Sequence, residues 1–380
     1  MKIRYFDNAA TTSINEKVLI KMFPYLTNSY GNASAMYTIG RQAKKAIEEA
    51  RHEVANIINA NSKEIYFTSC GSESDNTALK GYAYANKEKG KHIITSKIEH
   101  HAILESCSTL EKQGFEVTYL NVNKNGMIDV NELINSITPD TILISIMFAN
   151  NEIGTIQPIE KIADIAKSKN IVFHTDAVQA VGNIPIDVQK LGIDMLSASA
   201  HKLHGPKGIG VLYVRNGINF EKYINGGHQE RNKRAGTENV AGIVGVGEAC
   251  KIARQNLNYH IEYLTKLRNY YIRRISKEIP NIKINGDLEK RLPGNANISF
   301  KDIDAQELLF KLDEVGICAS SGSACNTGIQ TPSHVLIAIG LSPEEAGGAL
   351  RTTFGEENTI EDIDVLIDEI KKFLSEKQKE

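Results

Sequence analysis

Short hydrophobic runs alternate with longer amphipathic segments between residues 64 and 214. Several of these runs are apolar at consecutive positions, which is typical of strands covered on both faces. The segments between them show helical spacing and end at glycine or asparagine, residues that commonly terminate helices. This alternation predicts an α/β layer with a mostly parallel sheet. The predicted strands are 64–69, 92–96, 117–122, 141–148, 171–176 and 208–214, and the predicted helices are 73–90, 102–114 and 159–170.

The pattern changes towards the C-terminus. Residues 248–279 resemble one long charged helix, followed by apolar stretches at 281–287 and 296–300, a helix over 304–316 and a closing helix. Thr359 and Asp362 have the spacing of a capping box at the start of that last helix, and apolar residues from Ile363 to Leu374 form one stripe along it. We expect an N-terminal segment (1–15) that packs with the small domain, a large α/β domain (16–259) and a smaller α+β domain (260–380).

Charge and cysteine usage narrow the class of protein. Lys and Arg number 44, Asp and Glu 46, and the net charge is −2, with no basic stripe that would indicate a nucleic-acid partner. The first residues, MKIRYFDNAATT, lack the apolar run of a signal peptide, and no stretch approaches the ~18 apolar residues of a membrane span. The five cysteines show no CxxC spacing, which favours reduced thiols over a disulfide framework or a zinc site. We expect a cytoplasmic globular protein.

Polar and titratable residues stand where the predicted strands end. The sequences at these points are TSCGSES, SKIEHH, FANNEIG, HTDAVQ and SASAHKLHG. Ligands of open parallel sheets bind at the C-terminal ends of the strands. Five polar strand ends therefore predict one pocket.

Three of these ends match the needs of pyridoxal 5′-phosphate. The turn SCGSESDN (69–76) opens a helix whose free N–H groups suit a phosphate, although an ordinary N-cap by Ser72 or Ser74 explains it equally well. Asp176 ends an apolar strand, where it serves as an N-cap or ion-pair partner, or keeps a cofactor's ring nitrogen protonated. Lys202 lies among small and apolar residues, and a desolvated lysine offers the neutral amine that a Schiff base requires. Together they predict a pyridoxal-phosphate site, with Ser199 and His201 as further phosphate donors.

Other candidate residues have both a structural and a functional interpretation. His100 follows a strand and either caps a helix or stacks on the cofactor ring and moves protons. Cys325 lies within CASSGSACNTGIQTPSHVL (318–336), a composition that favours a mobile surface loop, and an exposed thiol there suits nucleophilic or carrier chemistry. Arg351 begins a predicted strand and suits a substrate carboxylate, or is an ordinary structural arginine. His174, His204 and His228 lack the spacing of metal ligands.

Several motifs resemble those of one enzyme family over residues 5 to about 355. They include YFDNAATT, TSCGSESDN, EHHAIL, NNEIGTIQPI, HTDAVQA, SAHKLHGPKGIG, RAGTEN and SSGSACNTG. These motifs resemble the NifS/IscS group of cysteine desulfurases, in the class V aminotransferase superfamily. The resemblance implies a fold-type-I pyridoxal-phosphate homodimer that converts L-cysteine to L-alanine and places the sulfur on the enzyme as a persulfide. It also implies an iron–sulfur scaffold or another protein as sulfur acceptor.

The resemblance also implies roles for individual residues. Lys202 resembles the Schiff-base lysine, Asp176 the partner of the ring nitrogen, His100 the stacking acid/base, and Cys325 the persulfide nucleophile, which would touch a nascent cluster in a scaffold complex. The remaining implied contacts are Gln179 to the phenolic oxygen, Asn151 to cofactor and substrate, Arg351 to the substrate carboxylate, and a phosphate cradle of Gly71, Ser72, Ser199, His201 and, from the second subunit, Thr237.

Two positions depart from the family pattern. Cys70-Gly71-Ser72 replaces the usual Gly-Ala-Thr, and LRTTFG replaces an Arg-Phe-Ser or Arg-Leu-Ser run around Arg351. The alternatives left open by the sequence are a selenocysteine lyase or another lyase or aminotransferase of the same superfamily. A binding protein on an inherited fold is a further alternative, which predicts the loss of Lys202 or Asp176, whereas both are present.

Overall fold

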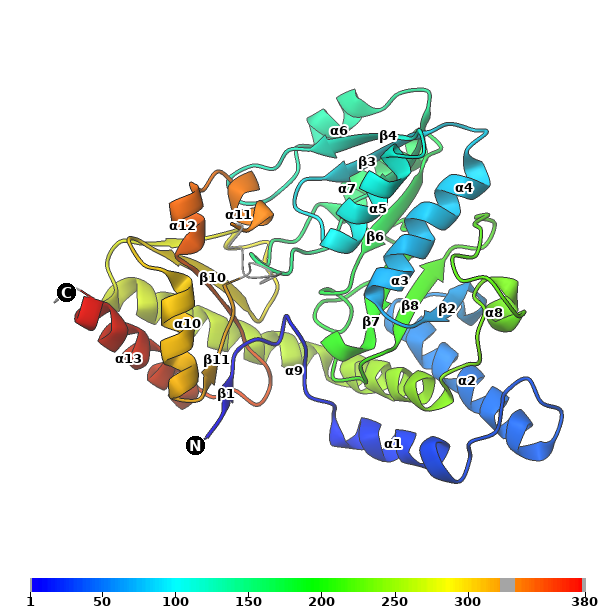
Figure 1. The fold of residues 1–380 in the computed structure, drawn as a ribbon, viewed down its shortest axis with the longest axis horizontal. Helices are drawn as coiled ribbons and strands as arrows, with labels where there is room; N and C mark the ends of the chain where they lie inside the picture. Colours follow the sequence, from blue (N-terminus) through cyan, green and yellow to red (C-terminus); the bar gives the residue numbers. More distant parts are fainter. Residues whose placement is uncertain (1, 322–331, 378–380) are drawn as a thin grey trace.

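A seven-stranded sheet forms the centre of the larger part of the molecule (Figure 1). The structure is a computed structural model that describes residues 2–321 and 332–377. The strand order is β2-β8-β7-β6-β5-β3-β4, and β8 runs antiparallel to both of its neighbours while the other pairs are parallel. The predicted α/β layer with a mostly parallel sheet is therefore confirmed. The strands are β2 (Ile65–Thr68), β3 (His92–Ser96), β4 (Glu116–Leu120), β5 (Thr141–Ser145), β6 (Val172–Asp176), β7 (Met195–Ser199) and β8 (Gly210–Val214).

The sequence pattern found six of these seven strands. It missed β7, because Ser197, Ala198 and Ser199 are small or polar although they are buried. Several predicted strands were too long, most of all 141–148: β5 ends at Ser145, and Ile146, Met147 and Phe148 are buried beyond the ladder. In both cases burial is set by the tertiary structure and not by the local run of apolar residues.

Helices cover both faces of the sheet. Neighbouring strand residues such as Leu143 and Ile144 enter different hydrophobic clusters, which shows that each face has its own core. One face is covered by α3 (Gly71–Asn76), the π-helical turn η2 (Thr77–Gly81), α4 (Tyr82–Asn86) and α5 (His101–Glu111). The other face is covered by α2 (Thr38–Ile57), α7 (Ile159–Ser168) and the first part of α9 (Val240–Glu278). The helix predicted over 73–90 is thus interrupted by a π-helical turn.

The helix predicted over 248–279 begins earlier, at Val240. Its first turns are rich in small residues because they lie tightly against α2, where a Cβ on Gly247 would stand 2.6 Å from the Cα of Ala50. Two further helices that the pattern did not reveal, α1 (Glu16–Thr27) and α2, pack on this part of α9. Short elements complete this part of the chain: η1 (Ser62–Glu64), α6 (Val130–Ser136), η3 (Ala200–Lys202) and α8 (Gln229–Asn232).

A second core forms around the end of α9. The antiparallel sheet β12-β10-β9 packs there with α10 (Ala305–Glu314) and α13 (Ile360–Lys377), and α11 (His334–Ala338) and α12 (Pro343–Gly347) lie nearby. Its strands are β9 (Ile282–Ile284), β10 (Asn295–Phe300) and β12 (Ala349–Thr353). Arg351 was expected to begin a strand but stands in the middle of β12, because the preceding Ala349 and Leu350 are already paired with β10.

The N-terminal segment joins the two cores. β1 (Arg4–Tyr5) pairs in parallel with β11 (Ile317–Cys318), and Phe6 is fully buried in the second core. A few residues later the chain reaches the large sheet, where the Thr12 amide donates to the carbonyl of His201 at 3.0 Å. This crossing segment therefore forms one wall of the space above the strand ends.

Candidate active site

One cavity brings together most of the residues predicted from the sequence. It lies at the C-terminal ends of β5, β6 and β7, between α3, the crossing segment and β12. Ten predicted site residues line it: Gly71, Ser72, His100, Asn151, Asp176, Gln179, Ser199, His201, Lys202 and Arg351. Thr237 does not line this cavity. Cys325 lies outside the described residues.

Lys202 stands in η3, directly after β7. Its Nζ atom donates hydrogen bonds to the carbonyl oxygens of Ala9 and Ala10, the second at 2.6 Å. Burial, and secondarily the nearby Arg351 guanidinium, lower the pKa of Lys202 to about 8. The surroundings of this amine therefore favour its neutral, nucleophilic form far more than water does.

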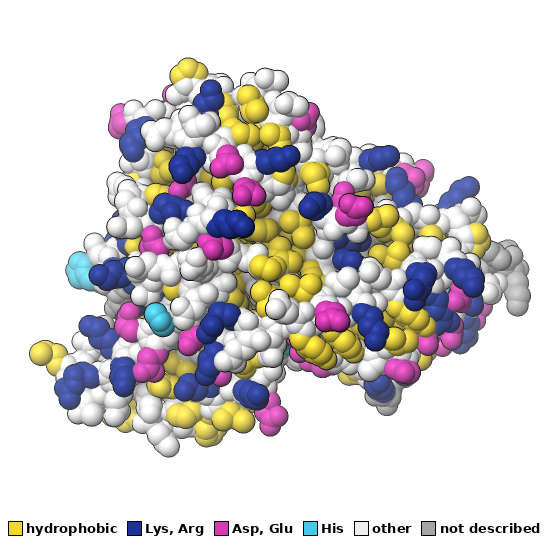
Figure 2. Space-filling view, turned by 180° about the vertical axis from the view of Figure 1, so that it is seen from behind, with side chains coloured by type: hydrophobic (Ala, Val, Ile, Leu, Met, Phe, Trp, Pro, Cys, Tyr) yellow, Lys and Arg dark blue, Asp and Glu magenta, His cyan; other side chains and the backbone are white. Residues whose placement is uncertain are grey.

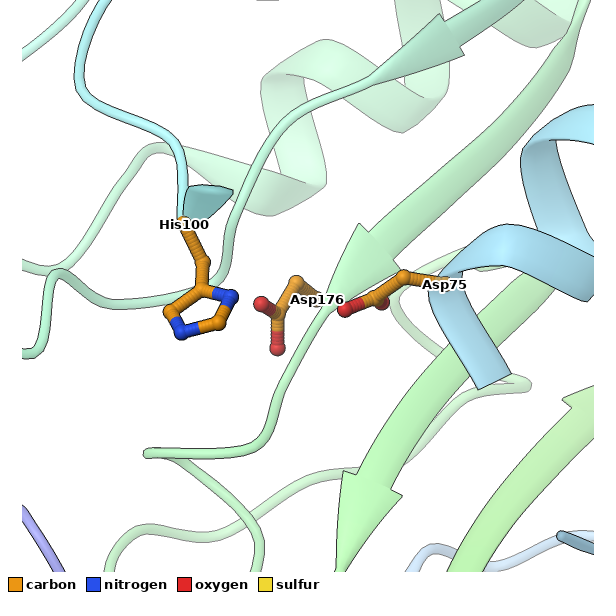
Figure 3. Close-up of side chains that lie close together, drawn as sticks. All are labelled: Asp75, His100 and Asp176. Carbon is orange, nitrogen blue, oxygen red and sulfur yellow. The ribbon is translucent and has the colours of Figure 1, made fainter. Parts of the chain in front are cut away.

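Asp176 lies between the His100 ring and Asp75 (Figure 3). It ends β6, and its Oδ1 atom accepts a hydrogen bond from the Val178 amide at 2.9 Å. Burial raises the pKa of Asp176, while His100 and Lys202 favour its charged form. A cationic group placed opposite Asp176 would find a preformed negative partner.

The position of His100 is compatible with both predicted roles, as a helix cap and as a side chain of the cavity. Its Nδ1 atom caps α5 by accepting a hydrogen bond from the Ala102 amide at 3.1 Å. The same ring lines the cavity, where solvent reaches it although protein surrounds it on most sides. Burial lowers the pKa of His100. A neutral ring held by a cap is well placed to stack on a flat ligand.

The start of α3 forms an anion seat. Gly71 begins the helix, and a Cβ there would stand 2.8 Å from the Val178 side chain, so a larger residue would require that side chain to shift. Ser72 is exposed beside it, and Ser199 lies across the cavity at the end of β7. His201 completes the seat, with Nδ1 and Thr11 Oγ1 3.1 Å apart. Backbone N–H groups of a first helical turn and hydroxyl donors together suit a phosphate.

Arg351 provides a second anion-binding group. It is buried, and its Nη2 atom donates to Asp7 Oδ1 at 2.7 Å, while Nη1 donates to the Asn151 carbonyl at 3.4 Å. Among the described residues its Nε atom has no acceptor, although that atom is buried. An unsatisfied buried guanidinium nitrogen is costly, so this side chain retains capacity for a carboxylate ligand.

The sequence matches the family described as "Aminotransferase class-V" over residues 4–366. The chain belongs to this family. It is 53% identical over 367 residues to "Cysteine desulfurase IscS" of Methanosarcina thermophila, with 97% of this chain and 91% of the relative covered. It is 51% identical over 376 residues to "Cysteine desulfurase IscS" of Clostridium botulinum strain Hall, with 98% and 95% covered. The solved structure titled "NIFS-LIKE PROTEIN" superimposes with a TM-score of 0.93 at 39% identity, covering 98% of this chain and all of that one.

Thr237 lies in an exposed segment between β8 and α9. The segment passes through three successive left-handed residues, Glu230, Arg231 and Asn232. A buried ion pair holds this turn, because Arg51 donates to both oxygens of Glu230 at 2.7 and 2.9 Å. Arg234 further ties the segment to Glu73 in α3 at 2.9 Å. Thr237 is therefore presented outwards from a firmly anchored turn.

Sequence reasoning missed several residues of the site. Ala9 and Ala10 were not predicted to bind Lys202, and Asp7 was not predicted to pair with Arg351, because these contacts join distant parts of the chain. Asp75 also lines the cavity. The only signal for Asp75 was its place in the motif SCGSESDN.

Proposed function

We propose that this protein is a cysteine desulfurase that uses pyridoxal 5′-phosphate to release sulfur from L-cysteine, leaving L-alanine and a persulfide on Cys325. One observation carries the proposal: a desolvated amine, Lys202, and a buried acid, Asp176, line one cavity with an anion seat. The 51% identity to a relative named cysteine desulfurase supports this particular reaction.

The cavity fits the cofactor group by group. Lys202 would hold the aldehyde carbon, Asp176 the protonated ring nitrogen, and Gln179 the phenolic oxygen, while His100 would stack on the ring. Gly71, Ser72, Ser199 and His201 would bind the phosphate. Bound in this way, the cofactor supplies an electron sink for cleavage at the substrate.

The chain's own residues position the substrate and move its protons. Arg351 and Asn151 would hold the carboxylate of L-cysteine, which fixes the α-carbon near Lys202. Lys202 would take the α-proton as a neutral amine. The Cys325 thiolate would attack the substrate sulfur, so that an S–S bond forms, the C–S bond breaks, and the electron pair remains with the carbon skeleton that is protonated to alanine.

The described residues that flank Cys325 are anchored beside the cavity. Ser320 and Arg351 exchange backbone hydrogen bonds at 3.2 and 2.6 Å. On the other side, Ser333 donates to Glu152 Oε2 at 2.5 Å. The described residues on either side of position 325 therefore both contact residues at or next to the cavity, which supports the proposal that Cys325 is the nucleophile.

We further propose a homodimer in which Thr237 binds the phosphate held by the partner subunit. The outward position of Thr237 supports this, and so does the surface of α1, where Leu19, Ile20, Phe23 and Leu26 are each at least 47% exposed. Four exposed apolar side chains on a twelve-residue helix favour a protein contact over solvent.

The proposal also covers where the enzyme acts, its domains and its sulfur acceptor. No helix in the described part of the chain has the length and hydropathy to cross a membrane. Figure 2 shows positive and negative side chains interspersed among hydrophobic ones on one face, a distribution that does not favour nucleic acid. We propose a cytoplasmic enzyme with a large domain (16–259) and a small domain (260–380) that carries Cys325 and against which residues 1–15 pack. It would pass sulfur to an iron–sulfur scaffold or another acceptor, with Cys325 touching the nascent cluster in such a complex.

The test is alanine release from L-cysteine by the Cys325→Ser variant loaded with the cofactor. We expect at least a hundredfold loss of turnover with cofactor binding retained, because only the nucleophile is removed. Cys318→Ser is the matched control, since Cys318 lies in the same region but outside the cavity. Full turnover without Cys325 would contradict the persulfide mechanism, and a large rate preference for selenocysteine over cysteine would favour a selenocysteine lyase.

A further inference from the structure

A row of buried polar side chains crosses the central sheet beneath the cavity. Leu143, Val172 and Met195 stand on the face covered by α3–α5 and are part of, or pack against, one hydrophobic cluster. One pleat further along the same strands, this face carries Ser145, His174 and Ser197. All three are fully buried. Buried polar side chains in the middle of a sheet destabilise the folded state unless they form hydrogen bonds with one another.

The three residues form one hydrogen-bonded chain. Ser145 Oγ and His174 Nδ1 are 2.9 Å apart, and His174 Nε2 and Ser197 Oγ are 3.0 Å apart. Complete burial lowers the pKa of His174 to about 3, so the ring is neutral and uses one nitrogen as donor and the other as acceptor. The chain is therefore an uncharged polar network that fixes the orientation of each member.

This network lies next to Asp75. His174 Nε2 lies 3.8 Å from Asp75 Oδ1, and Asp75 is 1% exposed. Within the described parts of the chain, Asp75 Oδ1 has no hydrogen-bond partner. Figure 3 shows the Asp75 side chain, from α3, pointing towards Asp176, and ligand atoms of Asp75, Asp176 and His100 all lie within 4.8 Å of one another.

The surroundings of the two carboxyls differ. Asp176 faces two groups that carry positive charge when protonated, His100 and Lys202. Asp75 instead faces Asp176 and, further away, Glu99, and the nearby hydroxyl of Ser197 is the group that favours its charged form. Two buried like charges this close repel strongly, which favours the neutral form of one of the two carboxyls. Burial together with Asp176 and Glu99 raises the pKa of Asp75.

We propose that Asp75 is a positioning residue: a neutral carboxyl, buried beside the Ser145–His174–Ser197 chain, that leaves Asp176 as the single negative charge facing the ring nitrogen. The inference rests on the proposed binding of pyridoxal 5′-phosphate with its ring nitrogen opposite Asp176. It adds a second acid to the site, whose function depends on being uncharged.

The protonation of Asp75 is measured directly by infrared spectroscopy of the holoenzyme at pH 8. Exposed carboxyls are ionised there, so the carbonyl stretch of a protonated carboxyl reports only buried acids. We expect this signal to lose one component in Asp75→Asn. Glu99→Gln is the matched control, because burial also raises the pKa of Glu99, to about 8. The spectral component that is lost in Asp75→Asn must therefore still be present in Glu99→Gln. A spectrum that Asp75→Asn leaves unchanged would overturn the proposal.

Binding of pyridoxal 5′-phosphate to the apoprotein tests the positioning role. Asp75→Asn is expected to keep the Kd within about threefold, because a neutral amide replaces a neutral acid, whereas Asp75→Leu should weaken binding at least tenfold. His174→Gln should bind more tightly than His174→Leu, because glutamine retains a donor and an acceptor. A tenfold loss in Asp75→Asn, or none in Asp75→Leu, would contradict the proposal. These readouts do not depend on alanine release, so failure of the proposed reaction would be seen separately.

Discussion

Arg351 and Asp7 form an ion pair, with Arg351 Nη2 and Asp7 Oδ1 2.7 Å apart, although 344 residues separate them in the sequence. The pair joins β12 of the second core to the segment that crosses towards the large sheet. It holds the guanidinium at the rim of the cavity while leaving other N–H groups for a ligand. The geometry of this contact underlies the first prediction.

Replacing Arg351 with lysine should weaken substrate binding. A lysine cannot reproduce the planar guanidinium that matches a carboxylate with two parallel hydrogen bonds. We expect KM for L-cysteine to rise about 10- to 100-fold, in line with the loss of one charge-assisted hydrogen bond, while kcat changes much less. Steady-state kinetics of Arg351→Lys measure this. Arg215→Lys is the control, since Arg215 pairs with Asp194 away from the cavity; equal KM values for both variants would contradict the assignment.

The rate at which the apoprotein captures pyridoxal 5′-phosphate should depend on pH with a midpoint near 8. Only the neutral amine attacks an aldehyde, and burial lowers the pKa of Lys202 to about 8 from its usual value above 10. The rate should therefore rise through pH 7–9 and level off above. Stopped-flow recording of the visible absorption of the bound cofactor checks this. Lys202→Arg should show no such absorption, and a rate still climbing steeply above pH 9.5 would argue against a desolvated amine.

Mixed dimers test whether Thr237 acts across a subunit interface. Lys202→Ala and Thr237→Val homodimers should each have impaired activity. In a mixed dimer, one site combines the intact Lys202 of one chain with the intact Thr237 of the other. We expect tagged mixed dimers, purified by both tags, to recover about half of the wild-type activity per dimer. If Thr237 served the site of its own chain, the mixed dimer would contain no intact site and would remain impaired.

Glu152 should make the stability of the apoprotein fall as pH rises from about 4.5 to 7. Burial raises the pKa of Glu152 to about 7, so within this range the folded state binds more protons than the unfolded state, and stability decreases with pH. Glu152→Gln keeps an acceptor for Ser333 but cannot titrate. Relative to the wild type, it should gain up to about 3 kcal/mol between pH 5 and pH 8.

Urea unfolding at these two pH values measures the difference. Glu49→Gln, an exposed position in α2, provides the control. A parallel pH dependence in wild type and Glu152→Gln would show that Glu152 does not contribute in this way.

The local sequence determined those strands and helices whose own residues show a clear hydrophobic pattern. Strands such as β3, covered on both faces, appear as uninterrupted apolar runs, and the helix stripe from Ile363 onwards identifies α13. The polar strand ends contain nine of the ten predicted residues that line the cavity, because these strands bring their C-terminal ends to one edge, whereas Arg351 comes from β12. The family resemblance added roles that spacing alone left open.

Only the tertiary structure decided the contacts between distant segments. The burial of β7, the ion pair of Asp7 with Arg351, and the carbonyls of Ala9 and Ala10 that bind Lys202 each depend on chain crossings that no local pattern encodes. The same holds for Asp75, whose neighbours come from β6 and β7. Desolvation and charge proximity set the chemistry of these groups, and both are properties of packed neighbours and not of neighbours in sequence.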